Sequence, residues 1–239
     1  MACTLLLRGV LALGAVMVLV GSPGCLVLSS SGRSAAAANA SEGTKPEVQS
    51  SVDGAELAAG SVGVVPTVFS AGVGAGDDPL LRSLQLQERL VEWTAKKRPS
   101  LRPRRLLPPS LGAARGDLEA LLEDYRTGAA LDPASLRRVG GAASVSYLAF
   151  SRIDRLEQAS HIAAVGSPES LACLSDATAA ASWTIFDCHT GEAVWQARHT
   201  VREDGEPVPV QDERSECRAR EAPLEALFME LAEALPTQA

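Results

Sequence analysis

The sequence predicts an α/β fold of the α+β kind, in which helices cover a single mixed sheet. Three observations predict it: β-branched runs and amphipathic helical patterns follow one another along the chain, turn residues separate them, and no internal repeat divides them. The predicted domain spans residues 61–239, a length at which roughly 70% of the unfolded surface becomes buried in one core. Residues 1–24 are predicted to be a signal peptide and residues 25–60 a flexible tether.

The expected strands are short apolar or alternating runs between turn residues. The first, VGVVPTVF, is β-branched and lies between glycine and serine-glycine signals. The last two are joined by residues 187–191, a glycine-containing connection that is typical of a hairpin. The predicted strands cover residues 62–69, 145–153, 177–187 and 192–201, with a further short one near 104–107. Residues 161–175 are predicted to be a variable stretch and residues 202–220 a charged loop.

Four helices are expected from capping residues that precede apolar positions of helical spacing. Each start carries an aspartate, a proline or both, which satisfy or avoid the free amides of a first turn. Glycines mark two of the predicted ends. The predicted helices are residues 79–97 after Asp78, residues 118–127 capped by Asp117, residues 133–139 capped by Asp132, and residues 223–235.

The first 24 residues have the character of an export signal. Arg8 precedes an apolar stretch, residues 9–20, which is shorter than the about 20 residues that a membrane-spanning helix needs. Residues 21–24, GSPG, then break the helix with small residues, as a peptidase cleavage region requires. The chain is therefore predicted to be exported.

The residue after this region is Cys25, and the region resembles the processing site of bacterial lipoproteins. In that class the cysteine thiol carries a diacylglycerol, so Cys25 is the predicted lipid attachment site, with Gly24 matching the pattern and Ser22 and Pro23 departing from it. Two alternatives stay open: a soluble secreted protein cut after Gly24 or Ala40, and an uncleaved anchor. The lipoprotein interpretation implies a cell-envelope protein, anchored in the outer membrane and facing the periplasm.

The tether is predicted from composition. Residues 29–60 are rich in serine, alanine and glycine and lack a sustained apolar period, so they cannot bury enough surface to order themselves. A flexible segment of this length spans roughly 30 Å. Such a tether would let an anchored domain stand away from a membrane surface.

Charge and cysteine content limit the function further. The formal net charge of −7 disfavours nucleic acid as a partner, because that binding needs many lysine and arginine contacts to phosphate. Three cysteines, Cys173, Cys188 and Cys217, belong to the predicted domain. In an oxidising compartment we expect one disulfide and one free thiol, and the spacing leaves the pairing open.

No catalytic residue, metal site or cofactor is predicted. His189 and His199 are expected at opposite ends of a strand, too far apart to share a metal, and Cys188 has no second ligand pair at zinc spacing. The strongest local charge feature is a basic run that forms either a solvated linker or a contact with an anionic surface or acidic partner. Its residues are Lys96, Lys97, Arg98, Arg102, Arg104 and Arg105.

Three phrases resemble a known group. They are residues 131–140 with Leu131-Asp132-Pro133, the strand phrase 145–153, and the hairpin phrase 185–195 with Thr190-Gly191-Glu192. Together they resemble envelope lipoproteins with a TolB-N-terminal or CsgG-like α/β domain, among them the curli-secretion lipoprotein and the lipoprotein activator of penicillin-binding proteins. The resemblance covers roughly residues 62–235, and it departs from the group at Ser151, where a glycine is usual. It implies roles in binding and assembly rather than catalysis.

The hairpin phrase also has a plain structural interpretation. Asp187 can accept hydrogen bonds from turn amides, Gly191 supplies a positive φ, and Trp195 buries a large ring on the sheet.

The expected function is a non-catalytic, lipid-anchored envelope protein that binds another envelope protein. One alternative is a subunit of an outer-membrane secretion pore, which needs membrane-spanning hairpins and is disfavoured by the interruptions at Gly166 and Pro168. Another is a periplasmic enzyme whose site has no recognisable motif.

Overall fold

The computed structural model describes residues 45–74, 76, 78–164, 171–205, 207–209 and 223–237. The predicted signal peptide, Cys25 and Cys217 lie outside these residues. The described residues belong to one compact unit.

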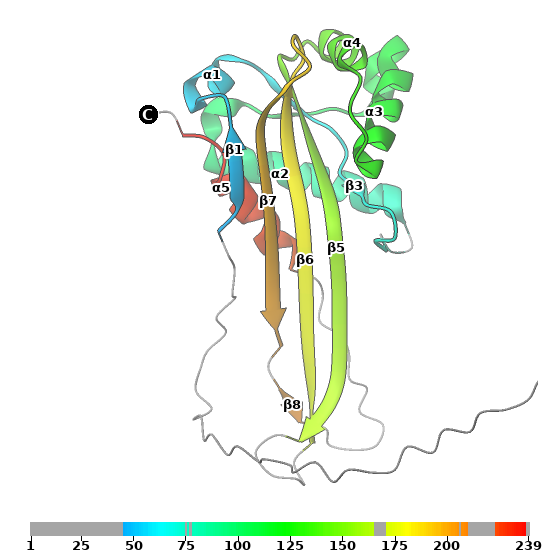
Figure 1. The fold of residues 1–239 in the computed structure, drawn as a ribbon, viewed down its shortest axis with the longest axis vertical. Helices are drawn as coiled ribbons and strands as arrows, with labels where there is room; N and C mark the ends of the chain where they lie inside the picture. Colours follow the sequence, from blue (N-terminus) through cyan, green and yellow to red (C-terminus); the bar gives the residue numbers. More distant parts are fainter. Residues whose placement is uncertain are drawn as a thin grey trace, which may run out of the picture. The chain divides into compact units, whose positions relative to one another are not determined.

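A mixed eight-stranded sheet forms the centre of the structure, as the sequence predicts (Figure 1). Six strands follow the order β1-β7-β6-β5-β2-β4, while β3 pairs with β5 and β8 pairs with β6. The pairs β2–β4, β2–β5 and β3–β5 are parallel, and the others are antiparallel. The strands are β1 (Glu47–Ser50), β2 (Val62–Val64), β3 (Val68–Phe69), β4 (Arg104–Arg105), β5 (Tyr147–Ala164), β6 (Leu171–Asp187), β7 (Ala193–Asp204) and β8 (Val208–Pro209).

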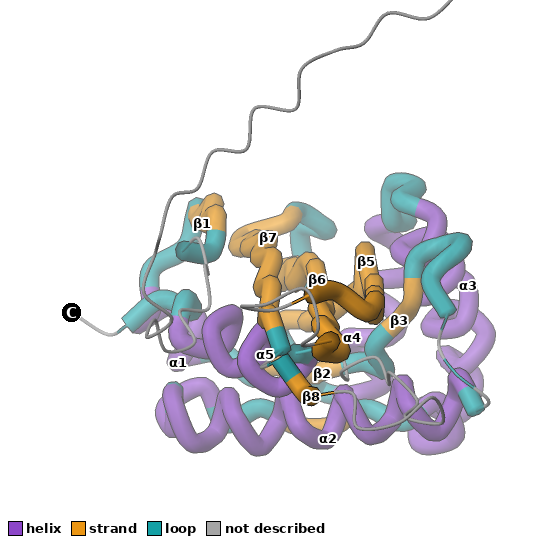
Figure 2. Tube along the Cα trace, turned by 90° about the horizontal axis from the view of Figure 1, so that it is seen from below, coloured by secondary structure: helices purple, strands orange, loops and turns teal. Residues whose placement is uncertain are grey.

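Helices cover both faces of the sheet. On one face α2 and α5 share a hydrophobic core with the sheet, and Figure 2 shows them on the same side of the strands. On the other face α3 and α4 enclose a second core. The helices are α1 (Gly54–Ala59), α2 (Pro79–Lys97), α3 (Arg115–Thr127), α4 (Pro133–Ala143) and α5 (Leu224–Glu233), with short 3₁₀ turns η1 (Pro99–Leu101) and η2 (Pro108–Ala114).

The alternation of side chains along β5 divides the two cores. Tyr147 and Ala149 belong to the core under α2 and α5, whereas Leu148 and Phe150 belong to the core under α3 and α4. Successive side chains of a strand point to opposite faces, so one strand supplies both cores. This double burial explains the nearly continuous apolar run in that part of the sequence.

A buried glutamine positions α2 over the parallel edge of the sheet. The side-chain nitrogen of Gln87 donates hydrogen bonds to the carbonyl oxygens of Val64 and Leu106, each at 2.7 Å. Ser83 on the same helix donates to the carbonyl of Thr67. Because a buried polar group is costly when unpaired, these bonds fix which face of α2 meets the sheet.

The far halves of β5 and β6 stand clear of the helices as a ribbon (Figure 1). Their pairing runs without a break from Tyr147 opposite Asp187 to Ala164 opposite Leu171, apart from one bulge after Ile153. The predictions of a strand end at Ile153 and of a variable stretch at 161–175 are therefore wrong for the described residues. Both faces of β5 from Glu157 to Ile162 are exposed, so no hydrophobic alternation marks this half in the sequence.

Residues 47–59 are part of the folded domain, which corrects the predicted boundary at residue 61. Strand β1 pairs with β7 from Glu47 opposite Arg198 to Ser50 opposite Trp195. Asp53 caps α1 by accepting a hydrogen bond from the amide of Glu56, and Leu57 of α1 is fully buried. A fully exposed edge strand and a six-residue helix with one deep apolar side chain leave too little periodicity to be seen in the sequence.

Other differences have local causes. The predicted strand 62–69 is divided into β2 and β3, because Pro66 has no amide to contribute to a ladder. Asp117 is not the N-cap that we expected, since α3 begins at Arg115, and its carboxylate instead binds Arg138 of α4 at 2.7 Å. The cap at Asp132, the bounds of α2 and the left-handed Gly128 after α3 are confirmed.

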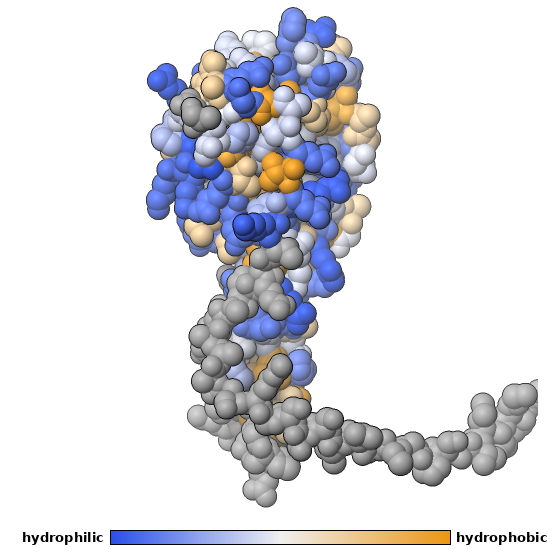
Figure 3. All heavy atoms as spheres, turned by 60° about the vertical axis from the view of Figure 1, so that its left-hand side comes forward, coloured by the Kyte–Doolittle hydropathy of each residue, from blue (hydrophilic) through white to orange (hydrophobic). Residues whose placement is uncertain are grey.

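The surface drawn in Figure 3 is mainly hydrophilic, with hydrophobic side chains in small separate patches. Among the described helices, none has the length and apolarity needed to cross a membrane.

The new domain boundary leads to a prediction. Replacing the buried Leu57 with alanine should lower the free energy of unfolding by about 2–4 kcal/mol, because it removes apolar contacts and leaves a cavity. Urea unfolding followed by the fluorescence of the buried Trp183 and Trp195 measures this. Leu80→Ala is the matched control, since Leu80 is 68% exposed and its loss should cost less than about 0.5 kcal/mol. Equal effects of the two substitutions would show that α1 does not belong to the core.

Candidate protein-binding groove

A hollow of about 590 Å³ lies between α2, the first turn of α5 and the exposed half of β5. We call it the α2–α5 groove. Its wall on α2 carries Arg82, Gln85, Leu86, Arg89 and Trp93. The volume lies within the range of roughly 300–1,000 Å³ that ligand sites usually have.

Helical spacing places one stripe of α2 along the groove. Three lining residues of α2 follow Arg82 by four, seven and eleven positions: Leu86, Arg89 and Trp93. All four therefore lie on one side of the helix. Leu86 is buried in the core beneath. The ring of Trp93 stacks on Phe228 of α5, with centroids 6.4 Å apart and planes at 24°. The floor of the groove is therefore held by the core.

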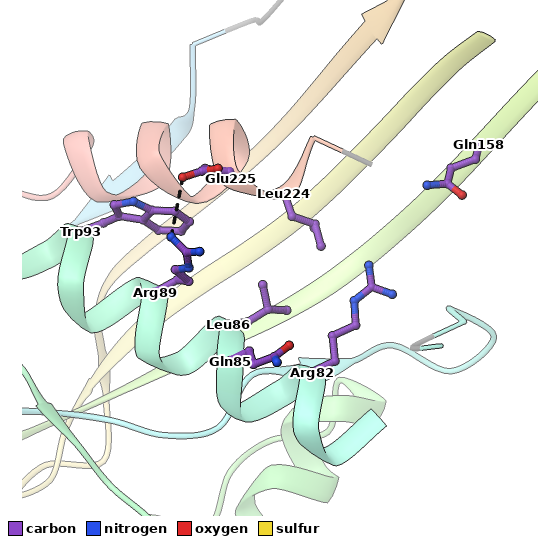
Figure 4. A pocket seen from close by; sticks show the side chains of 8 residues that line it. All are labelled: Arg82, Gln85, Leu86, Arg89, Trp93, Gln158, Leu224 and Glu225. Carbon is purple, nitrogen blue, oxygen red and sulfur yellow. Dashed lines mark ion pairs between the residues drawn. The ribbon is translucent and has the colours of Figure 1, made fainter. Parts of the chain in front are cut away.

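The other walls come from elements far away in the sequence. Leu224 and Glu225 begin α5, and Gln158 lies on the exposed half of β5, opposite Ala177 of β6 (Figure 4). Figure 4 shows Arg82 reaching across from α2 toward the side on which Gln158 lies. The groove thus spans the helical layer and the ribbon.

Two guanidinium groups and one carboxylate line the groove. Nη1 of Arg89 lies 3.9 Å from Oε1 of Glu225, and the two side chains are 59% and 72% exposed. An ion pair this open contributes little, about 0–1 kcal/mol. The guanidinium of Arg82 lies 6.0 Å from the ring centroid of Phe69. The lining is therefore cationic on balance, in a chain whose net charge is −7.

The chemistry of this lining suits binding. Guanidinium groups donate hydrogen bonds, glutamine amides both donate and accept, and the apolar floor offers contact area. Among the described residues that line it, there is no cysteine, serine or histidine that would act as a nucleophile or general base.

Part of the predicted basic run is engaged within the molecule. Lys97 forms an ion pair with Glu233 of α5. Arg98 donates to the backbone carbonyls of Glu233 and Leu235, the last of these at 3.0 Å. These contacts attach the end of α2 to the end of α5.

The rest of the run is divided between contacts and solvent. Nη1 of Arg105 lies 3.2 Å from Oε1 of Glu88, and Arg104 donates a hydrogen bond to the backbone carbonyl of Ser144 at 2.9 Å. The side chains of Lys96 and Arg102 are exposed and have no hydrogen-bond or ion-pair partner in the described part of the chain. Contact of this run with an anionic surface stays a prediction.

The cysteines have different environments. Cys173 is disulfide-bonded, and its partner lies outside the described residues. Cys188 is free and buried, and it contacts the backbone of α4 so closely that a Cβ on Gly140 would lie 2.5 Å from its Sγ. Burial, together with the nearby Asp187 carboxylate, raises the pKa of the Cys188 thiol to about 12. This thiol is structural in character.

The histidines occupy separate places. His199 of β7 is buried, and its Nε2 lies 2.6 Å from Oε2 of Glu230, which ties α5 to the sheet. His189 lies in the connection between β6 and β7 and is exposed. Within the described ranges, no group of three histidine, cysteine or acidic side chains could hold a metal ion.

The structural interpretation of the hairpin phrase is confirmed. Oδ1 of Asp187 accepts hydrogen bonds from the amides of His189 and Thr190, at 2.6 and 3.1 Å. Gly191 has a φ of +80°, and a Cβ there would come within 2.5 Å of Pro133. Trp195 is 1% exposed and meets Trp183 edge-to-face at 5.5 Å. The phrase builds the turn and the core.

None of the residues that line the groove is among the site residues predicted from the sequence. The stripe on α2 could have been read from its spacing. The walls formed by Gln158 and Leu224 could not, because they depend on the unforeseen extension of β5 and on the packing of α5.

The raised pKa of Cys188 predicts a pH dependence of stability. The folded thiol stays protonated to about pH 12, whereas in the unfolded chain it ionises near pH 9.0. Its contribution is therefore complete below pH 9 and declines as the pH rises toward 12. Urea unfolding at pH 8 and pH 10.5 should show a larger loss of stability for the wild type than for Cys188→Ala. The two buried tyrosines are common to both chains, so parallel losses would contradict the assignment.

Comparisons with known proteins find distant structural similarity alone. No family model and no curated protein match the sequence. Three similar solved structures are a PelC dodecamer from Paraburkholderia phytofirmans, the lipoprotein GNA1162 from Neisseria meningitidis and the LpoB C-terminal domain from Salmonella enterica. Their identities are 13%, 12% and 14%, and their TM-scores 0.40, 0.38 and 0.32. The matches cover 80%, 61% and 59% of this chain, and 93%, 83% and 82% of the other chains. The narrower resemblance to TolB-N-terminal or CsgG-like domains stays a prediction.

Proposed function

We propose that this chain is a lipid-anchored, non-catalytic protein of the bacterial cell envelope that binds another envelope protein. The observation that carries the proposal is the α2–α5 groove, a concave and mixed polar-apolar surface that joins the helical layer to the protruding ribbon. Protein-binding surfaces commonly combine an aromatic anchor, arginine and an apolar centre. Trp93, Arg89 and Leu86 supply these three parts here.

Anchoring through Cys25 fits the position of the folded domain. The first described strand begins at Glu47, so a tether would comprise residues 25–46. A flexible segment of that length spans about 25 Å. This reach would let the domain stand away from the membrane that holds the anchor.

The side-chain chemistry favours binding over catalysis. The buried thiol of Cys188 is held in its protonated form, and the buried His199 is engaged with Glu230. Neither lines the groove. A disulfide between Cys173 and Cys217 would leave Cys188 as the free thiol, and we include this pairing in the proposal.

Lipid attachment has a direct test. Cells that express the full chain and are fed a radiolabelled fatty acid should incorporate the label into the wild-type protein. The Cys25→Ser variant should show no label, because the acceptor thiol is gone, while its export continues. A label that persists in Cys25→Ser, or that is missing from both chains, would contradict the anchor.

Partner binding is tested by crosslinking from the groove in the intact envelope. A photoreactive amino acid in place of Gln85 or Gln158 should capture the same protein from either wall, because the two residues line one hollow. The control position is Glu119, which lies on α3 beside the other face of the sheet.

The captured protein decides between the alternatives. A distinct envelope protein joined at both groove positions, and not at Glu119, supports the proposal. No capture at either position, or equal capture at all three, would overturn it. A ring-sized oligomer of this chain alone would favour the secretion-pore alternative instead.

A further inference from the structure

We infer that the partner presents to the α2–α5 groove an extended, acidic segment with apolar side chains between its carboxylates. This inference rests on the proposed binding function and deepens it, because it names the chemistry that the groove recognises. Three properties of the groove carry it: its length, its charge and its apolar floor.

The length of the groove fits a short extended peptide. From Arg82 to Trp93 the helix rises about 16 Å, at 1.5 Å per residue. An extended chain covers that distance with about five residues, at 3.3 Å each. Gln158, on the ribbon side, offers an amide that can bond to the backbone of such a segment.

The charge of the groove selects carboxylates. Arg82 and Arg89 are two helical turns apart, which separates their Cα atoms by about 10 Å. In an extended peptide, side chains on one face are about 7 Å apart at i and i+2, and about 13 Å at i and i+4. Two acidic residues at either spacing lie within reach of the flexible arginine side chains.

Arg89 can leave Glu225 for a carboxylate of the partner at a small cost in free energy. At 3.9 Å and with both side chains largely exposed, the pair gives up little when Arg89 turns to a carboxylate of the partner. A guanidinium can then form two parallel hydrogen bonds with that carboxylate. Glu225 at the rim disfavours an acidic group placed directly beside it, which limits the possible registers.

The floor of the groove accepts apolar side chains. Leu86, Trp93 and Leu224 lie among the polar lining residues, and Trp93 is held in place by its stacking on Phe228. A rigid aromatic ring gives contact area at a small entropic cost. Apolar residues next to the acidic ones would therefore add affinity that charge alone does not give.

A binding assay with defined peptides tests the inference. The probe is a fluorescein-labelled peptide, Glu-Leu-Glu-Leu-Glu, and its counterpart is Lys-Leu-Lys-Leu-Lys. Fluorescence anisotropy with the full-length chain in detergent should show binding of the acidic peptide and at least tenfold weaker binding of the lysine peptide. Raising the salt concentration should weaken the acidic complex, since its charges are only partly buried.

Matched charge reversals locate the site. Arg89→Glu should weaken the acidic probe at least tenfold, because it replaces attraction with repulsion at the centre of the groove. Arg126→Glu is the control: Arg126 lies exposed on α3, where it pairs with Glu123, and its reversal should leave probe binding unchanged. Equal binding of the two peptides, or an equal effect of the two reversals, would overturn the inference.

Failure of this inference can be distinguished from failure of the proposed function. If Gln85 still captures its protein when Arg89→Glu is present at wild-type yield, the groove binds a partner and the acidic chemistry is wrong. If Gln85 captures nothing in the wild type, the proposed function fails first. Vesicles that contain phosphatidylglycerol form a further arm. Arg89-dependent binding to these vesicles without peptide binding would assign the groove to a lipid headgroup and overturn the inference.

Discussion

The antiparallel pairing of β5 with β6 is the interaction on which the other parts of the structure depend. In the body of the domain, β5 supplies Tyr147 and Ala149 to one core and Leu148 and Phe150 to the other. Both helical layers therefore pack against side chains of the same strand. From Glu157 onward the same ladder continues to Ala164 with β5 exposed on both faces, so its backbone bonds to β6 hold the ribbon together there.

The α2–α5 groove forms because one half of β5 is covered by helices and the other half is exposed. Inside the domain the strand is covered by α2 and α5, whereas Gln158 lies just past the point where that cover ends. The position of α5 is set by the bond from His199 to Glu230 at one place and by the contacts of Arg98 with its last carbonyls at another. The wall formed by Leu224 and Glu225 is thus fixed to the sheet and to α2.

Parts of this fold that depend on interactions between residues close in sequence were predictable. Parts that lack such interactions were not. Asp78 and Asp132 cap their helices, and Asp187 holds its turn through bonds to nearby amides; these patterns depend on residues a few positions apart. The ribbon and β1 gave no such signal, because exposed strands need no hydrophobic period. Gln87 shows the same limit, since a buried glutamine in α2 is intelligible only once its carbonyl partners on the sheet are known. The groove combines both cases: the sequence displays the α2 stripe, but tertiary packing alone brings Gln158 to it.

The distribution of positive charge gives the groove its specificity in an acidic protein. Lys97, Arg98 and Arg105 belong to the basic run, but their charges are engaged with acidic side chains or helix-end carbonyls, which reduces their attraction for a partner. Arg89 is also paired, with Glu225, but Arg82 and Arg89 lie beside an apolar floor. Their attraction for a carboxylate is therefore combined with contact area, which exposed basic residues on a convex surface cannot offer. An acidic segment that also carries apolar side chains satisfies both parts of the groove, whereas a purely charged ligand satisfies only one.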